Sequence, residues 1–107
     1  MEITAIEYFE AFERKDISAI REMFDFNVTL RDWEISALGI DSVLAAIARI
    51  FYSTETITIQ IMNIFKEQTF VVCELNITIN TLNTIHVVDI IEFNSIGKIC
   101  AIRAFKG

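Results

Sequence analysis

The sequence predicts an α+β domain in which N-terminal helices pack on one face of an antiparallel sheet. Apolar residues recur with a helical period mainly in the first half of the chain and with a period of two in the second half. Turn residues separate the alternating segments, as expected for strands joined by short loops. Helices followed by strands favour a layer of helices on one side of the sheet.

Length and composition narrow the class of protein. A chain of 107 residues can build one hydrophobic core but not two, so residues 1–107 are expected to form a single domain. The net charge of −6 argues against nucleic acid as a partner, because phosphate binding needs a basic surface. No long uncharged apolar stretch and no signal-peptide pattern is evident. We therefore expect a cytoplasmic protein that does not bind a membrane.

Two or three helices are expected in the first half of the chain. The first, over residues 4–15, carries one apolar stripe that consists of Ala5, Tyr8, Phe9 and Phe12. Asp16 has the side chain of an N-cap for a short second helix, whose apolar residues are Ile17, Ile20 and Phe24. A third helix is expected over residues 42–51, after Gly39. Its only charged residue is Arg49, so this helix should be largely buried.

Five strands are expected. A short one over residues 28–32 places Val28, Leu30 and Asp32 on one face. The others follow the third helix as a meander that ends with residues 98–106. Their expected inward residues are Ile57, Ile59, Ile61 and Phe65 in the first, Val71, Cys73, Leu75, Ile77 and Ile79 in the next, and Cys100, Ile102 and Ala104 in the last. Both cysteines should pack as small hydrophobic side chains.

One strand carries an acid on its apolar face. Residues 85–93 are rich in β-branched side chains, and one face of this strand consists of Ile85, Val87, Asp89, Ile91 and Phe93. Burial of Asp89 among these residues favours the neutral carboxyl group, which can donate a hydrogen bond. The pattern indicates chemistry in an apolar cavity.

This order of elements resembles the nuclear-transport-factor-2-like (NTF2-like) superfamily, a cone-shaped α+β fold with an apolar pocket between a curved sheet and helices. Within it, the chain is most similar to the SnoaL-like polyketide cyclases and bacterial ketosteroid isomerases. The segments that carry the resemblance are Tyr-Phe-Glu-Ala-Phe at 8–12, Asp-Ile-Ser-Ala-Ile at 16–20, Val-Thr-Leu-Arg-Asp at 28–32, Gly39, Val-Val-Asp-Ile-Ile-Glu-Phe at 87–93 and Gly-Lys-Ile at 97–99.

The resemblance implies roles for three residues. Tyr8 falls at the oxyanion-binding tyrosine of the isomerases, Asp32 at their catalytic base and Asp89 at their protonated aspartic acid. Such a set would isomerise an unsaturated ketone, with Asp32 moving the proton and the other two donating to the negative oxygen. This chemistry needs no metal or organic cofactor.

The resemblance also implies a ligand pocket. Its expected lining is Phe12, Ile47, Phe51, Ile85, Val87, Ile102 and Ala104, with Trp33 near the mouth. The expected ligand is a small apolar molecule that bears a carbonyl group. Phe24 and Ile47 stand where the isomerases carry tyrosines that support the hydrogen-bond network.

Each polar residue also has a structural interpretation. Tyr8 can simply pack its ring in the core, and Asp32 can simply hydrogen-bond the loop that follows it. The alternative to an enzyme is therefore a ligand-binding, dimerisation or protein-interaction module that kept the fold without turnover.

The outward face of the predicted sheet is more apolar than a solvent-exposed surface usually is. It carries Phe70, Val72, Val88 and Ile90 among polar residues. We expect two chains to pack across this face in a symmetric homodimer. His86 should lie on the sheet exterior or at that contact, and Arg103 at the surface or the interface.

Overall fold

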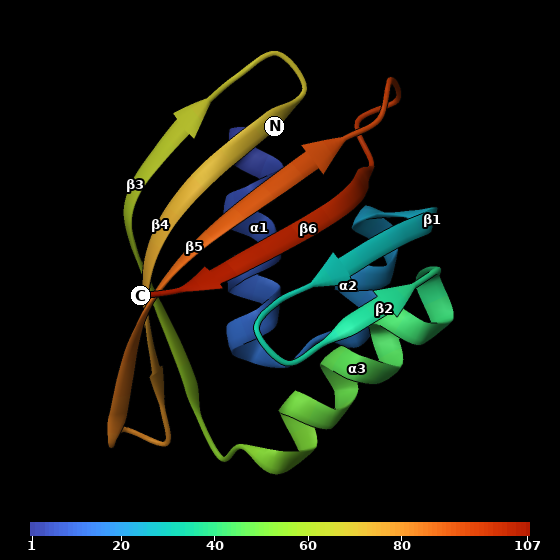
Figure 1. Cartoon of the computed structure of the whole chain (residues 1–107). Coiled ribbons are helices and arrows are strands. Elements are labelled where there is room, and N and C mark those ends of the chain that lie inside the picture. The colour runs from blue at the N-terminus through green and yellow to red at the C-terminus, as the bar shows by residue number, and fades with distance from the viewer.

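Three helices cover one face of a curved six-stranded sheet in the computed structural model, which describes residues 1–107 (Figure 1). The helices are α1 (Glu2–Arg14), α2 (Ile17–Met23) and α3 (Ile40–Ser53). The strands are β1 (Phe24–Arg31), β2 (Ser36–Leu38), β3 (Ile57–Lys66), β4 (Phe70–Ile79), β5 (Asn83–Phe93) and β6 (Ile99–Lys106). The predicted α+β class is confirmed, and the open, curved sheet with its helices forms the predicted cone.

The sheet is mixed, in the order β2-β1-β6-β5-β4-β3. Strands β3 to β6 form the predicted antiparallel meander. Strand β1 departs from the predicted antiparallel order because it runs parallel to β6. Alternation along a strand reveals which residues face the core but not the direction of its neighbour, so the sequence pattern could not show this pairing.

The chain leaves α2 and enters the sheet earlier than predicted. Phe24 caps the end of α2 and opens β1, rather than lying on the apolar face of the helix. The three-residue strand β2 was not predicted, since it is too short to show alternation; it pairs with the end of β1. The turn between these strands holds Asp32, which follows β1 instead of ending it.

Helix α3 is longer than predicted and buries only one side. It begins at Ile40, directly after Gly39 with its positive φ of 87°. Its core-facing residues are Ile40, Val43, Leu44, Ala46, Ile47 and Phe51, whereas Arg49 and Tyr52 are exposed. The expectation of a largely buried helix is therefore wrong for the outer side. No helix of the structure is both long enough and apolar enough to cross a membrane.

Two strand irregularities change the predicted inward residues. The β3–β4 register shifts between Ile61 and Asn63, so Ile64 is half-buried and Phe65 is exposed, the reverse of the prediction. The β5–β6 register shifts between Glu92 and Phe93. Beyond that shift, Ile99 is fully buried while Cys100 is only half-buried. An extra residue in one strand reverses the phase of every side chain beyond it, and composition alone does not reveal where it falls.

Lys15 joins the ends of α1 and α3. It ends α1 in a left-handed conformation with φ of 59°. Its Nζ donates hydrogen bonds to the carbonyl oxygens of Phe51 (2.9 Å), Glu55 (3.1 Å) and Thr54. A cation at the C-terminus of α3 satisfies carbonyls that lack helical partners and favours the negative end of the helix dipole.

Lys15→Met should therefore lower the free energy of unfolding by about 1–2 kcal/mol, because methionine keeps the aliphatic chain but removes the donors. Urea denaturation at pH 7 measures the change. Lys66→Met is the control, since its only ion-pair contact is 3.9 Å from Glu2 and both side chains are exposed. Equal losses for the two variants would contradict the proposed role of Lys15.

Candidate functional site

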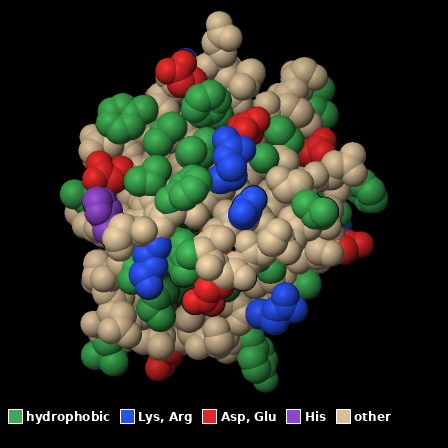
Figure 2. Space-filling model, in the orientation of Figure 1, with side chains coloured by type: hydrophobic (Ala, Val, Ile, Leu, Met, Phe, Trp, Pro, Cys, Tyr) green, Lys and Arg blue, Asp and Glu red, His purple; other side chains and the backbone are tan.

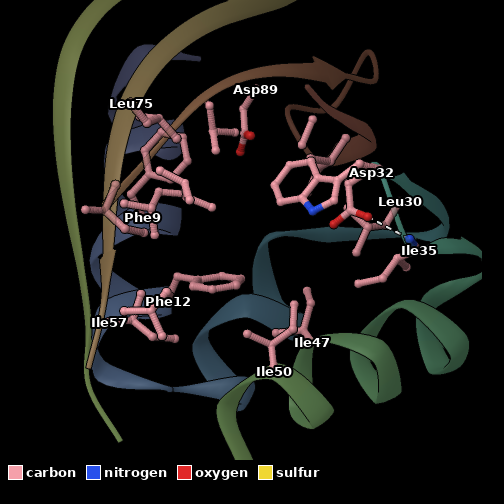
Figure 3. A pocket seen from close by; sticks show the side chains of 18 of the residues that line it. Phe9, Phe12, Leu30, Asp32, Ile35, Ile47, Ile50, Ile57, Leu75 and Asp89 are labelled. Carbon is pink, nitrogen blue, oxygen red and sulfur yellow. Dashed lines mark hydrogen bonds between the residues drawn. The ribbon is translucent and has the colours of Figure 1, made fainter. Parts of the chain in front are cut away.

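A cavity of about 430 Å³ lies between the inner face of the sheet and helices α1 and α3 (Figure 3). Of its 21 lining residues, 17 are hydrophobic. Water is poorly held by such a lining, so an apolar molecule can occupy the cavity without displacing strongly bound water. The four others are Asp32, Glu34, Thr54 and Asp89. The volume suits a small organic molecule, since ligand sites typically measure about 300–1,000 Å³.

The three polar residues singled out in the sequence all line this cavity. Tyr8 comes from α1, Asp32 from the turn after β1, and Asp89 from β5. These positions are far apart in the chain, and the fold brings them to one space. In Figure 3 the carboxyl group of Asp89 lies at the top of the cavity and that of Asp32 at its right.

Asp89 is the only buried charged residue, with 8% of its surface exposed. It pairs across the sheet with Cys73 of β4 and Ala104 of β6. Burial, and secondarily the negative charge of Asp32, raises the pKa of Asp89 from 3.8 to about 7. At neutral pH a substantial fraction of Asp89 is therefore a neutral acid that can donate a hydrogen bond.

Tyr8 is held by aromatic neighbours. The centroid of its ring lies 5.5 Å from that of Phe9, 5.8 Å from that of Phe12 and 6.0 Å from that of Phe24. Burial, with a further contribution from the charge of Asp89, raises the pKa of Tyr8 above its ordinary value. The phenol consequently stays protonated over the whole physiological range and can serve as a donor.

Neither the Asp89 carboxyl group nor the Tyr8 hydroxyl group has a hydrogen-bond partner within the protein. Every fully buried polar side-chain atom, by contrast, has such a partner. Both groups must therefore reach the open space of the cavity. Unused donors in an apolar cavity are the feature that a ligand oxygen would satisfy.

Asp32 has two different oxygens. Its Oδ1 accepts hydrogen bonds from the backbone N–H groups of Glu34 (2.8 Å) and Ile35 (2.6 Å), which fixes the turn that lines the cavity. Its Oδ2 makes no hydrogen bond within the protein. The structural and the chemical interpretations of Asp32 are thus compatible, because each uses one oxygen.

Most of the predicted apolar lining also reaches the cavity. The predicted residues found there are Phe12, Trp33, Ile47, Ile85, Val87, Ile102 and Ala104. Phe51 is not among the lining residues; it lies at the end of α3, where its ring packs edge-on against Phe12 with the centroids 4.8 Å apart. Trp33 is 42% exposed, as expected for a residue near the mouth.

The sequence interpretation missed other lining residues. Ile57, Ile59, Leu75, Ile77 and Ile79 lie on the inward faces of β3 and β4, and their strand phase could have identified them. Glu34 and Thr54 lie in a turn and at a helix end, where no periodic pattern indicates a direction.

Comparison with known proteins identifies the family and the fold of the chain. The family model described as "SnoaL-like domain" matches residues 5–102. No curated protein matches the sequence.

Solved structures share the fold at low identity. A candidate SnoaL-like polyketide cyclase from Shewanella denitrificans OS-217 has a TM-score of 0.88 at 14% identity, covering 99% of this chain and 89% of that one. The epoxide hydrolase/cyclase-like enzyme SalBIII, described with pyran ring formation in salinomycin, gives 0.85 at 24%, with 99% and 89% covered. A candidate ketosteroid isomerase from Kribbella flavida DSM 17836 gives 0.86 at 12%, with 98% and 76% covered.

Proposed function

We propose that this chain, which belongs to the SnoaL-like domain family, binds a small apolar molecule through a carbonyl or enol oxygen. One observation carries the proposal: Tyr8 and Asp89 bring two unused hydrogen-bonding groups into a cavity that is otherwise almost entirely apolar. A ligand without an oxygen would leave both groups desolvated and unsatisfied. An apolar ligand with one suitably placed oxygen satisfies them.

The same arrangement supports proton transfer. A carbonyl group held by Tyr8 and neutral Asp89 would acidify the adjacent C–H bond, because negative charge that develops on oxygen is stabilised by both donors. Asp32 Oδ2 would accept that proton and return it to another carbon of the same molecule. The reaction would be an isomerase- or cyclase-like rearrangement, the kinds of activity named for the solved structures that share this fold.

A binding protein without turnover is the second candidate. Phe24 packs beside Tyr8 and has no hydrogen-bonding group, and Ile47 also lines the site without one. Nothing else in the structure donates to the Tyr8 hydroxyl, so its phenol is less polarised than a tyrosine in a hydrogen-bonded chain. This observation favours binding over fast catalysis.

Binding can be tested with 2-naphthol, whose phenol oxygen mimics an enolate, and with naphthalene as the matched compound that lacks the oxygen. We expect 2-naphthol to bind about tenfold or more tightly in fluorescence titrations, and Tyr8→Phe to remove most of that difference. Tyr52→Phe is the control, because Tyr52 is 96% exposed. Equal affinities of the wild-type protein for the two compounds would refute the donor role.

We also propose a homodimer through the outer face of the sheet. Phe65, Val72 and Ile90 are register neighbours across β3, β4 and β5, and Val88 lies beside Phe105 of β6. Figure 2 shows the resulting apolar surface on this face, interrupted by charged side chains. An apolar patch of this kind is typical of an interface rather than of a fully solvated surface.

Multi-angle light scattering at micromolar concentration should therefore give twice the chain mass of 12.3 kDa. Val72→Asp should shift the protein towards the monomer, because it would bury a charge at the contact. Leu82→Asp is the control at a turn away from this face, where the leucine is 83% exposed. A stable wild-type monomer would refute the dimer.

A further inference from the structure

A second hollow lies on the outer side of the turn that closes the cavity. We call it the basic groove and define it by Arg31, Arg103 and Lys106 around Trp33. Three of its residues also line the cavity, namely Asp32, Trp33 and Ala104. The groove and the cavity are therefore adjacent, on either side of the Asp32–Trp33 turn and the end of β6.

The groove concentrates positive charge in an acidic protein. The chain has nine Lys and Arg residues and a net charge of −6. Three cations and one carboxylate, Asp32, line the groove. Figure 2 shows Lys and Arg side chains on the same face of the molecule as β6 and the adjoining end of β1. An accumulation of like charges is unfavourable unless an anion accompanies it.

Two of these cations have no carboxylate partner. Arg103 donates to Glu92 at 2.6 Å, but Arg31 and Lys106 take part in no ion pair. Elsewhere, Arg14, Arg21 and Lys66 pair with carboxylates, and Lys15 and Lys98 donate to backbone carbonyls. Apart from Arg49 on α3, the Lys and Arg side chains that have neither kind of partner therefore lie in this groove.

The backbone holds two of the cations close together, and the third lies against the ring of Trp33. Arg31 of β1 and Arg103 of β6 are register partners in the parallel pair, so their side chains leave the sheet side by side. Lys106 Nζ lies 5.9 Å from the centroid of the Trp33 ring, a cation–π contact that keeps the ammonium group above the turn. Trp33 itself lines both spaces.

We propose that the ligand is an amphipathic organic anion, whose apolar body occupies the cavity and whose charged oxyanion lies in the basic groove. The inference rests on the proposed binding function and narrows its ligand class. Arg31 and Lys106 supply charge-assisted hydrogen bonds to the oxyanion, while Trp33 covers the apolar segment that passes the turn. Since both cations are exposed, salt should weaken their contribution.

Two dyes separate the apolar and the anionic parts of the site. 8-Anilinonaphthalene-1-sulfonate carries an anionic sulfonate, and N-phenyl-1-naphthylamine is its uncharged counterpart. In Arg31→Gln/Lys106→Gln, we expect the affinity for the sulfonate dye to fall by about tenfold. The affinity for the uncharged dye should not change. Arg49→Gln removes an unpaired exposed cation outside the groove and should alter neither affinity.

Each result decides between stated alternatives. If the uncharged dye binds and the double substitution leaves the affinity for the sulfonate dye unchanged, the anion site is refuted while the proposed binding function stands. If neither dye binds the wild-type protein, both fail. Arg31 and Lys106 could instead act at the subunit contact, and light scattering of the double variant tests this alternative. Loss of the dimer with unchanged dye affinity would assign both residues to that contact and overturn the inference.

Discussion

Asp89→Asn should raise the free energy of unfolding by about 2–4 kcal/mol at pH 8 and leave it nearly unchanged at pH 4. Burial raises the pKa of folded Asp89 from its ordinary 3.8 to about 7. The folded state therefore holds this proton more tightly than the unfolded state between these two pH values. Stability contributed by the neutral acid is complete below about pH 4 and is lost as the pH rises to about 7. Asparagine is neutral throughout and avoids that loss.

Urea denaturation at several pH values measures this difference, with Glu10→Gln as a control for removal of an exposed carboxylate on α1. The control should show no comparable pH-dependent gain. Titration of the Asp89 carboxyl carbon by NMR gives the pKa directly, and Asp32→Asn should lower it, because the Asp32 charge is its second cause. An Asp89 that ionises near pH 4, or an equal effect of Asp89→Asn at both ends of the pH range, would rule out the neutral donor.

The inward orientation of Asp89 was predicted correctly because its strand pairs with β4 in a regular register. Strands β4 and β5 pair without interruption from Phe70 to Ile79, so alternation alone placed the inward residues correctly. The same reasoning failed for Phe65 and Cys100, since each lies near a register shift. A bulge depends on how two strands fit together, which a single strand's pattern does not contain.

The remaining misses concern relations between distant segments. The parallel pairing of β1 with β6 brings Arg31 beside Arg103, and neither residue is unusual within its own strand. The basic groove therefore leaves no local signature in the sequence. Tyr8 and Asp32, by contrast, were placed by a helical stripe and by a strand phase, and the family resemblance supplied the expectation that both meet Asp89.

Asp32→Asn should abolish turnover of an unsaturated ketone while leaving binding of 2-naphthol nearly intact. A general base contributes about 10²–10⁴-fold in rate, and an amide cannot take up the proton. The substitution is well matched to this structure, because the asparagine side-chain oxygen can still accept the N–H groups of Glu34 and Ile35. The turn should keep its shape, so a lost rate would reflect lost chemistry.

The assay needs wild-type protein, a panel of steroid and smaller β,γ-unsaturated ketones, and ultraviolet detection of the conjugated product. Asp89→Asn keeps a donor and should be milder than Asp89→Leu, which removes one at a cost of about 10²–10³ in rate. Comparable rates for wild-type protein and Asp32→Asn would eliminate Asp32 as the base.

The result for the wild-type protein separates the three candidate classes. Turnover that requires Asp32 identifies an enzyme. Absence of turnover across the panel, together with tight binding of 2-naphthol, identifies a carrier, for which the isolated Tyr8 phenol beside Phe24 gives the physical reason. If the protein shows neither turnover nor binding, the outer face of the sheet remains as the functional surface. An empty cavity of about 430 Å³ with unsatisfied donors would then only destabilise the fold and would have no role in function.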